Sequence, residues 1–167
     1  MNIENALNEG SKILKKNNIK FSNLDSEILL SMVIGKDRKF IILNRDYTIE
    51  KICFNYFKRL IQERSNGKPI AYLLGKKSFW NYDFEIKEGT LIPRPDTELL
   101  IEETLKMYGK EKRLNILDIG TGSGCLLLSI LKERKNFLGI GIDISKKALN
   151  VARFNAKLQH LNNRVKF

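Results

Sequence analysis

The chain has 167 residues, of which 43% are hydrophobic, so we expect a packed core in one ordinary domain or two small ones. Its formal net charge of +11 is spread evenly along the sequence. Such a charge has two equally good explanations: an acidic partner, either nucleic acid or a protein that works beside it, or plain solubility. No apolar run approaches the roughly 18 residues that span a bilayer, and the N-terminus has no signal pattern, so we expect a cytoplasmic protein without membrane contact.

The first 75 residues predict a helical bundle, because apolar side chains recur at helical spacing in three segments that each bury one face. The predicted helices are Ile3 to Lys16, a segment entered through Ser22 and Asn23 and ended by Gly35, and a longer segment capped by Thr48 and ended by Asn66 and Gly67. The apolar side of the third helix consists of Ile52, Cys53, Tyr56, Phe57, Leu60 and Ile61. We expect the aromatic residues of this region to form a core in preference to a base-stacking surface.

Residues 76–92 predict a β-hairpin that links two domains. Large apolar and polar residues alternate from Trp80 to Lys87, which is the period of a strand with one buried face. Glu88 and Gly89 then give a turn signal, and residues 90–92 resume the strand. Because two strands alone are marginally stable, the hairpin is expected to pack on another element.

From residue 93 the sequence predicts the start of an α/β domain with a parallel sheet. Pro93 to Glu98 ends the hairpin and opens a helix that runs from about Asp96 to Tyr108, with an inward face of Leu99, Leu100, Leu105 and Met107. The predicted elements that follow are a strand at 114–119, a helix at 124–134, a strand at 137–143, a helix capped by Ser145 that ends near Gln159, and the start of a third strand at 164–167.

A glycine-rich segment, Asp118-Ile119-Gly120-Thr121-Gly122-Ser123-Gly124, lies where the first of these strands turns into a helix. Glycines permit unusual backbone angles and a close approach of the main chain to a ligand, and the helix start offers unpaired N–H donors. A dinucleotide fingerprint has its glycines at positions one, three and six, whereas the sixth position here is Cys125. An acid two residues before the first glycine, followed by this spacing, favours S-adenosylmethionine as the cofactor.

Asp143 closes the second strand, 19 residues after Gly124, where a carboxylate can accept hydrogen bonds from both hydroxyls of an adenosyl ribose. Asp118 is expected near the ammonium group of the cofactor. The predicted cofactor-binding residues are Asp118, Gly120, Thr121, Gly122, Ser123, Gly124 and Asp143.

The sequence contains two cysteines and one histidine. Cys53 and Cys125 lack the spacing of a metal site or a disulfide framework, so we expect no bound metal and two thiols that pack as small hydrophobes. His160 has no accompanying G-x-S-x-G motif, which argues against a nucleophilic triad and for a surface position at a helix end.

Four stretches occur in an order and spacing that resemble the PrmC/HemK family of protein-glutamine methyltransferases: Gly67 to Gly75, Phe79 to Phe84, Leu91 to Glu98, and the glycine-rich segment. The resemblance covers essentially the whole chain. It implies a helical substrate-recognition bundle at 1–75, a hairpin linker at 76–92 and a Rossmann-like methyltransferase domain at 93–167. It also implies the use of S-adenosylmethionine to methylate the glutamine side-chain amide in the Gly-Gly-Gln motif of peptide chain release factors. We expect the chain to be a monomer.

One motif of that family is absent. Family members hold the acceptor amide with an Asn-Pro-Pro-Tyr motif, whereas this sequence has prolines only at Pro69, Pro93 and Pro95. An amide nitrogen is a poor nucleophile, so it must be clamped and aligned for attack on the methyl group. We therefore assign no catalytic residue and expect an incomplete methyltransferase domain that is inactive alone, either the N-terminal part of a longer enzyme or a naturally shortened relative. Uncovered apolar strands point the same way, because a parallel sheet is normally buried on both faces.

Two other functions stay open at this point. A nucleic-acid amine methyltransferase would share the fold and suit the basic charge, and a non-catalytic relative could use the bundle to bind a partner protein. The roles of Arg94, Thr97 and Glu98 divide equally between substrate contact and helix capping or ion pairing.

Overall fold

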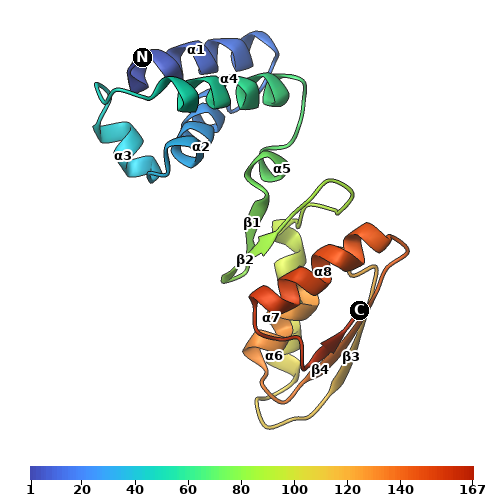
Figure 1. Cartoon of the computed structure of the whole chain (residues 1–167). Helices are drawn as coiled ribbons and strands as arrows, with labels where there is room; N and C mark the ends of the chain where they lie inside the picture. Colours follow the sequence, from blue (N-terminus) through green and yellow to red (C-terminus); the bar gives the residue numbers. More distant parts are fainter. The chain divides into compact units, whose positions relative to one another are not determined.

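The structure is a computed structural model that describes residues 1–167, and the chain divides into two compact units, Met1–Leu74 and Gly75–Phe167 (Figure 1). The division of the sequence at residues 75 and 92 into bundle, linker and catalytic domain stays a prediction. None of the helices is both long enough and apolar enough to cross a bilayer.

The first unit is helical. Its elements are α1 (Ile3–Lys16), α2 (Ser22–Ile34), α3 (Arg38–Leu43), α4 (Lys51–Ser65) and α5 (Ile70–Leu74). Helix α1 packs on α2 and α4, and the buried side chains between them include Leu14, Leu30 and Phe57. A Cβ atom on Gly10 of α1 would lie 2.8 Å from Cζ of Phe57, so glycine allows the close approach of α1 and α4. The predicted bundle is confirmed.

The start of α4 differs from the prediction. Glu50 is its N-terminal cap, whereas Thr48 pairs with Asn2 in an isolated antiparallel bridge. The segment before α4 is extended because it satisfies the free backbone donors of α1: the N–H of Ile3 donates to the carbonyl of Tyr47 at 3.0 Å. On α4, the predicted buried face is confirmed for Phe57, Leu60 and Ile61 and, partly buried against the same core, for Cys53, whereas Ile52 is 74% and Tyr56 41% exposed.

Two antiparallel strands begin the second unit, β1 (Lys76–Phe79) and β2 (Tyr82–Glu85). The predicted hairpin exists, but the turn that joins its strands lies at Trp80 and Asn81. Glu88 and Gly89 form a turn as predicted, whereas the strand predicted at 90–92 is absent. Trp80 has a φ of 54°, an unfavourable conformation for a bulky residue.

Two carboxylates hold Trp80 in that turn. Its backbone N–H donates to Oε1 of Glu98 at 2.7 Å, and its indole Nε1 donates to Oε1 of Glu133 at 2.9 Å. The rings of Phe79 and Phe84 meet edge to face, with centroids 6.4 Å apart, and both are buried. Glu98 and Glu133 are distant from Trp80 in sequence, so the local pattern of polar and apolar residues does not reveal the turn that they hold.

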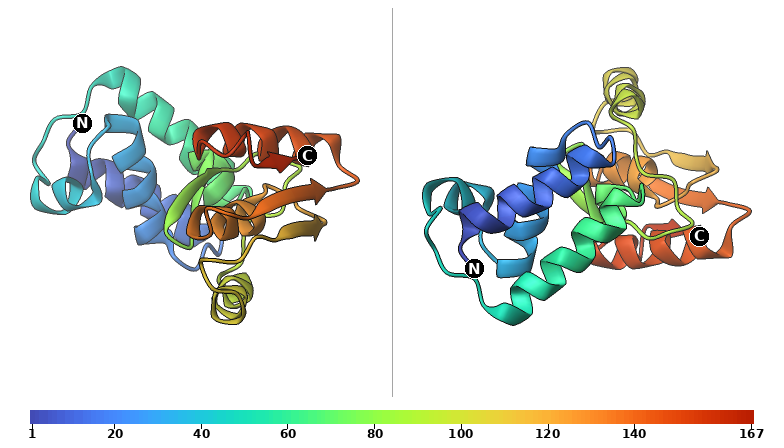
Figure 2. Two further views of the ribbon diagram at one scale, coloured as in Figure 1. Left: turned by 90° about the horizontal axis from the view of Figure 1, so that it is seen from below. Right: turned by 90° about the horizontal axis from the view of Figure 1, so that it is seen from above.

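The remaining elements are a 3₁₀ turn η1 (Pro95–Thr97), α6 (Glu98–Met107), β3 (Asn115–Ile119), α7 (Cys125–Glu133), β4 (Leu138–Ile142), α8 (Lys146–Leu158) and β5 (Val165–Lys166). The strands form a parallel sheet of order β3-β4-β5, with Leu117 opposite Ile140. Helix α7 packs on β4 and between α6 and α8 (Figures 1 and 2). This alternation is the beginning of a Rossmann-like fold, as predicted.

One face of the sheet is covered and the other is open. Gly139 and Gly141 of β4 are buried under the helices, and a Cβ atom on Gly139 would lie 2.9 Å from Cδ1 of Leu127 in α7. The opposite face exposes a row of large apolar side chains, namely Leu117, Ile119, Leu138, Ile140 and Ile142. The expectation of uncovered apolar strands is confirmed.

Helix α6 turns a different face inward from the predicted one. Leu99, Leu100 and Met107 are 59%, 56% and 70% exposed and Leu105 is half-buried, whereas Ile101 is fully buried. The helix packs on α7. Its buried stripe is therefore narrow, and helical spacing alone does not select which of its apolar residues occupy it.

Candidate cofactor site

The glycine-rich segment joins β3 to α7 and is fixed against the carboxyl end of β4. The N–H groups of Gly120 and Thr121 both donate to the carbonyl of Ile142, at 2.8 and 2.9 Å. Gly120, Gly122 and Gly124 have φ angles of 79°, 56° and 78°, which lie in the left-handed region. All three positions therefore favour glycine for conformational reasons, as the sequence predicted.

Asp118 stabilises the segment from within. Its Oδ2 accepts a hydrogen bond from the hydroxyl of Thr121 at 2.7 Å, and the carbonyl of Thr121 accepts one from the N–H of Gly124 at 2.8 Å. Each carboxylate oxygen has two lone pairs, so Asp118 keeps acceptor capacity for a cationic ligand group.

Asp143 connects the glycine-rich segment to the start of α8. Its Oδ2 accepts from the N–H of Gly122 at 2.9 Å, and its Oδ1 accepts from the N–H of Ser145 at 2.8 Å. Ser145 in turn caps α8 by accepting from the N–H of Ala148 at 3.2 Å. The carboxylate thus sits at the carboxyl ends of two adjacent parallel strands, where open α/β sheets bind their ligands.

The structure brings all seven predicted residues together, because six of them share one segment and Asp143 is hydrogen-bonded to it. Thr121 and Ser123 are 5% and 2% exposed, so their side chains pack inside the protein. Cys125 follows directly. It is buried, as predicted for a small hydrophobe, and this burial raises the pKa of its thiol to about 11.

Sequence inspection missed Asn155, which is the fully buried side chain of α8 that contacts this segment. Its Nδ2 donates to the carbonyl of Ser123 at 2.9 Å and to the carbonyl of Glu85 at 3.0 Å. The signal that could have revealed it is a polar residue on the inward face of α8, which otherwise carries Ala148, Ala152 and Ala156.

Of the three residues with an open role, Glu98 is engaged in the hairpin through its contact with the N–H of Trp80. Arg94 is exposed and precedes η1, and its carbonyl accepts from the N–H of Thr97 at 3.1 Å. The side-chain contact of Glu98 supports a structural role for that residue, whereas neither Arg94 nor Thr97 caps a helix with its side chain. His160 is exposed just past the end of α8, as predicted.

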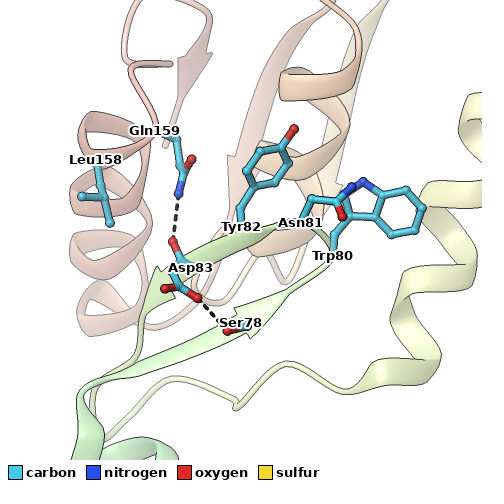
Figure 3. Close-up of a pocket in the computed structure, with 7 residues that line it drawn as sticks. All are labelled: Ser78, Trp80, Asn81, Tyr82, Asp83, Leu158 and Gln159. Atoms are coloured by element: carbon cyan, nitrogen blue, oxygen red, sulfur yellow. Dashed lines mark hydrogen bonds between the residues drawn. The ribbon is translucent and has the colours of Figure 1, made fainter. Parts of the chain in front are cut away.

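A cavity of about 640 Å³ lies elsewhere, between the hairpin and α8 (Figure 3). It is lined by Ser78, Trp80, Asn81, Tyr82, Asp83, Leu158 and Gln159. Polar groups at its edge already pair with one another: the hydroxyl of Ser78 donates to Oδ1 of Asp83 at 2.6 Å, and Nε2 of Gln159 donates to the carbonyl of Asp83 at 2.8 Å (Figure 3). The glycine-rich segment does not contribute to this cavity, so we place the candidate site at the strand ends.

Comparison with known families gives two matches. Residues 5–75 match the PrmC N-terminal domain, and residues 110–167 match a methyltransferase domain.

Curated relatives are similar over most of the chain. The release factor glutamine methyltransferase of Clostridium acetobutylicum is 40% identical over 166 residues, which are 99% of this chain and 58% of the relative. The protein of the same name from Buchnera aphidicola subsp. Baizongia pistaciae is 40% identical over 98% of this chain and 58% of its own length. That of Coxiella burnetii is 37% identical over 86% of this chain and 52% of its own. The chain thus spans little more than half the length of these relatives.

Among solved structures, a SAM-dependent methyltransferase from Geobacter sulfurreducens in complex with S-adenosyl-L-homocysteine is 27% identical. The alignment covers 44% of this chain and 28% of that protein, with a TM-score of 0.37.

Proposed function

Because this chain belongs to the PrmC family, we propose that it binds S-adenosylmethionine and serves the methylation of the glutamine side-chain amide in the Gly-Gly-Gln motif of peptide chain release factors. The observation that carries the proposal is the link between Asp143 and the N–H of Gly122. It joins a loop of three left-handed glycines, whose backbone a ligand can approach closely, to an acid at the end of the next parallel strand, where its carboxylate oxygens can accept from a ribose.

Each part of the site has a proposed partner on the cofactor. The backbone of Gly120 to Gly124 shapes the methionine side, and Asp118 lies near the ammonium group. Asp143 holds the ribose hydroxyls with the lone pairs that its two backbone donors leave unused. Ile144 follows Asp143 and is fully exposed, so its aliphatic side chain is available to cover an adenine ring.

The cofactor supplies an electrophilic methyl group on a sulfonium, and the acceptor must be held by other residues. The sequence of this chain contains no Asn-Pro-Pro-Tyr motif to accept hydrogen bonds from the amide N–H groups and align its nitrogen. We therefore propose that residues 1–167 bind the cofactor weakly and transfer no methyl group alone. The helical unit is proposed to recognise the release factor.

Calorimetry with S-adenosylhomocysteine tests cofactor binding. Asp143→Ala is expected to weaken binding by about 1–3 kcal/mol, the cost of leaving buried hydroxyl partners unpaired. Asp46→Ala removes an exposed aspartate of the helical unit and serves as the control, with unchanged affinity expected. Equal affinities of the wild type and Asp143→Ala would contradict the assignment.

Methyl transfer to a release factor is measured with radiolabelled S-adenosylmethionine. We expect no labelling of the release factor by residues 1–167, and robust turnover by this chain would refute the argument from the missing amide clamp. A second measurement compares the binding of this chain to an RNA with its binding to the release factor, because the two represent the two classes of methyl acceptor. Binding that falls steeply with added salt on RNA, and is absent with the release factor, would favour a nucleic-acid acceptor instead.

A further inference from the structure

Asn155 lies where the hairpin, α8 and the glycine-rich segment meet, and we propose that it is a positioning residue that couples the cofactor loop to the hairpin. Its consequence for cofactor affinity rests on the proposed function, whereas the coupling itself concerns only the folded chain.

The side-chain amide of Asn155 makes three hydrogen bonds, which engage its oxygen and both hydrogens of its nitrogen. Its Oδ1 accepts from the N–H of Glu85 at 2.7 Å, and its Nδ2 donates to the carbonyl of the same residue at 3.0 Å. This pair reproduces the contacts that a neighbouring strand would make with the end of β2. The second hydrogen of Nδ2 points to the carbonyl of Ser123 at 2.9 Å.

Few side chains can replace this one. An aspartate of the same length keeps the acceptor but has no donor for either carbonyl, and a serine or threonine has only one donor. A fully buried group that loses its partner is costly, because no water replaces the missing hydrogen bond. The geometry therefore assigns a function to this amide that alanine or leucine, the usual residues on a buried helix face, cannot perform.

The coupling joins the glycine-rich segment, which is proposed to bind the cofactor, to the end of the hairpin. Ser123, whose carbonyl accepts from Asn155, directly follows Gly122, whose N–H donates to Asp143, so Asp143 and Asn155 hold the loop at two adjacent residues. Glu85 ends β2 and is followed by the buried Ile86, after which the chain continues to the segment Leu91–Glu98. A ligand that orders the loop therefore also orders the end of the hairpin, and the effect is reciprocal.

Helix α8 offers a matched control. One turn after Asn155, Nε2 of the half-buried Gln159 donates to the carbonyl of Asp83 at 2.8 Å. Both residues thus tie α8 to β2, but only Asn155 also reaches the glycine-rich segment. Gln159→Ala removes a tie to the hairpin and leaves the loop contact intact.

Amide hydrogen exchange by NMR on the full chain, without cofactor, tests the coupling directly. In Asn155→Asp and Asn155→Ala we expect exchange of the hydrogen-bonded amides of Gly120, Thr121, Gly122 and Gly124 to be at least about tenfold faster than in the wild type, a change of about 1.4 kcal/mol in local opening. Gln159→Ala is expected to leave these amides within about twofold. Unchanged loop exchange in both Asn155 variants, or equal acceleration in Gln159→Ala, would overturn the proposal.

A measurement on the wild type keeps the test independent of how well the variants fold. Addition of S-adenosylhomocysteine is expected to slow exchange of the Glu85 amide together with the loop amides. Protection of the loop without protection of Glu85 would overturn the coupling. If the compound does not bind at all, the proposed function fails, whereas the exchange rates of the variants without cofactor still decide the role of Asn155.

Discussion

Two glycines of the cofactor loop share a backbone conformation but differ in their surroundings, which allows strain and packing to be separated. Gly120 and Gly124 have φ angles of 79° and 78°. A Cβ atom on Gly120 meets nothing within 4 Å, whereas one on Gly124 lies 3.2 Å from carbon atoms of Ala152, Leu128 and Phe167. Left-handed backbone costs an alanine about 1–2 kcal/mol, partly offset by about 0.4–1 kcal/mol of lost freedom in the unfolded chain.

Gly120→Ala is therefore expected to lower the free energy of unfolding by about 1 kcal/mol. Gly124→Ala incurs the same strain and in addition overpacks the junction of α7 and α8, which costs about a further 1–3 kcal/mol. The two variants share a chemical change and a φ angle, so their difference isolates the packing contribution.

Urea unfolding followed by tryptophan fluorescence measures this difference. The chain has one tryptophan, Trp80, which lies in the second unit together with the loop, so the signal reports on the relevant unit. We expect the midpoint of Gly124→Ala to lie below that of Gly120→Ala with unchanged slopes. Equal midpoints for the two variants would refute the packing argument, because strain alone would then account for both.

Two further predictions concern side chains outside the loop. Glu98→Ala removes the acceptor of the Trp80 N–H and should destabilise the second unit by about 1.5 kcal/mol in the same urea assay, whereas the exposed Glu102→Ala should not; equal losses would contradict the role of Glu98 in the turn. The raised pKa of Cys125, about 11, predicts that its thiol reacts more slowly with a thiol reagent at pH 8 than that of Cys53, and equal reactivity would contradict this. Because the unfolded chain loses this proton at a lower pH than the folded chain, the contribution of Cys125 to the free energy of unfolding is fully present below about pH 9 and falls as the pH rises towards 11.

Local sequence patterns predicted much of the architecture and the location of the site. The helical period of residues 3–16 and the alternation of short apolar runs with helices after residue 113 correspond to α1 and to β3, α7, β4 and α8. The glycine spacing predicted a loop with left-handed residues, because a glycine turn between a strand and a helix is a local requirement.

Contacts between distant residues produced the differences. The turn at Trp80 depends on Glu98 and Glu133, which follow it by 18 and 53 residues. The buried face of α6 depends on its packing against α7, so Ile101 and not Leu99 enters the core. The pattern of polar and apolar residues in a helix or strand does not specify which other element packs against it.

For the candidate site too, some features were predictable from the sequence and others were not. The sequence by itself determined the fold class, the glycine-rich segment and the acid that closes the following strand, because each depends on residue type and short spacing. Only the tertiary structure decided that Asp143 accepts a hydrogen bond from the N–H of Gly122 and that the buried Asn155 joins the loop to the hairpin. Hydrogen bonds between residues 21 and 32 positions apart form only when the strands and helices have packed, and no local pattern specifies them.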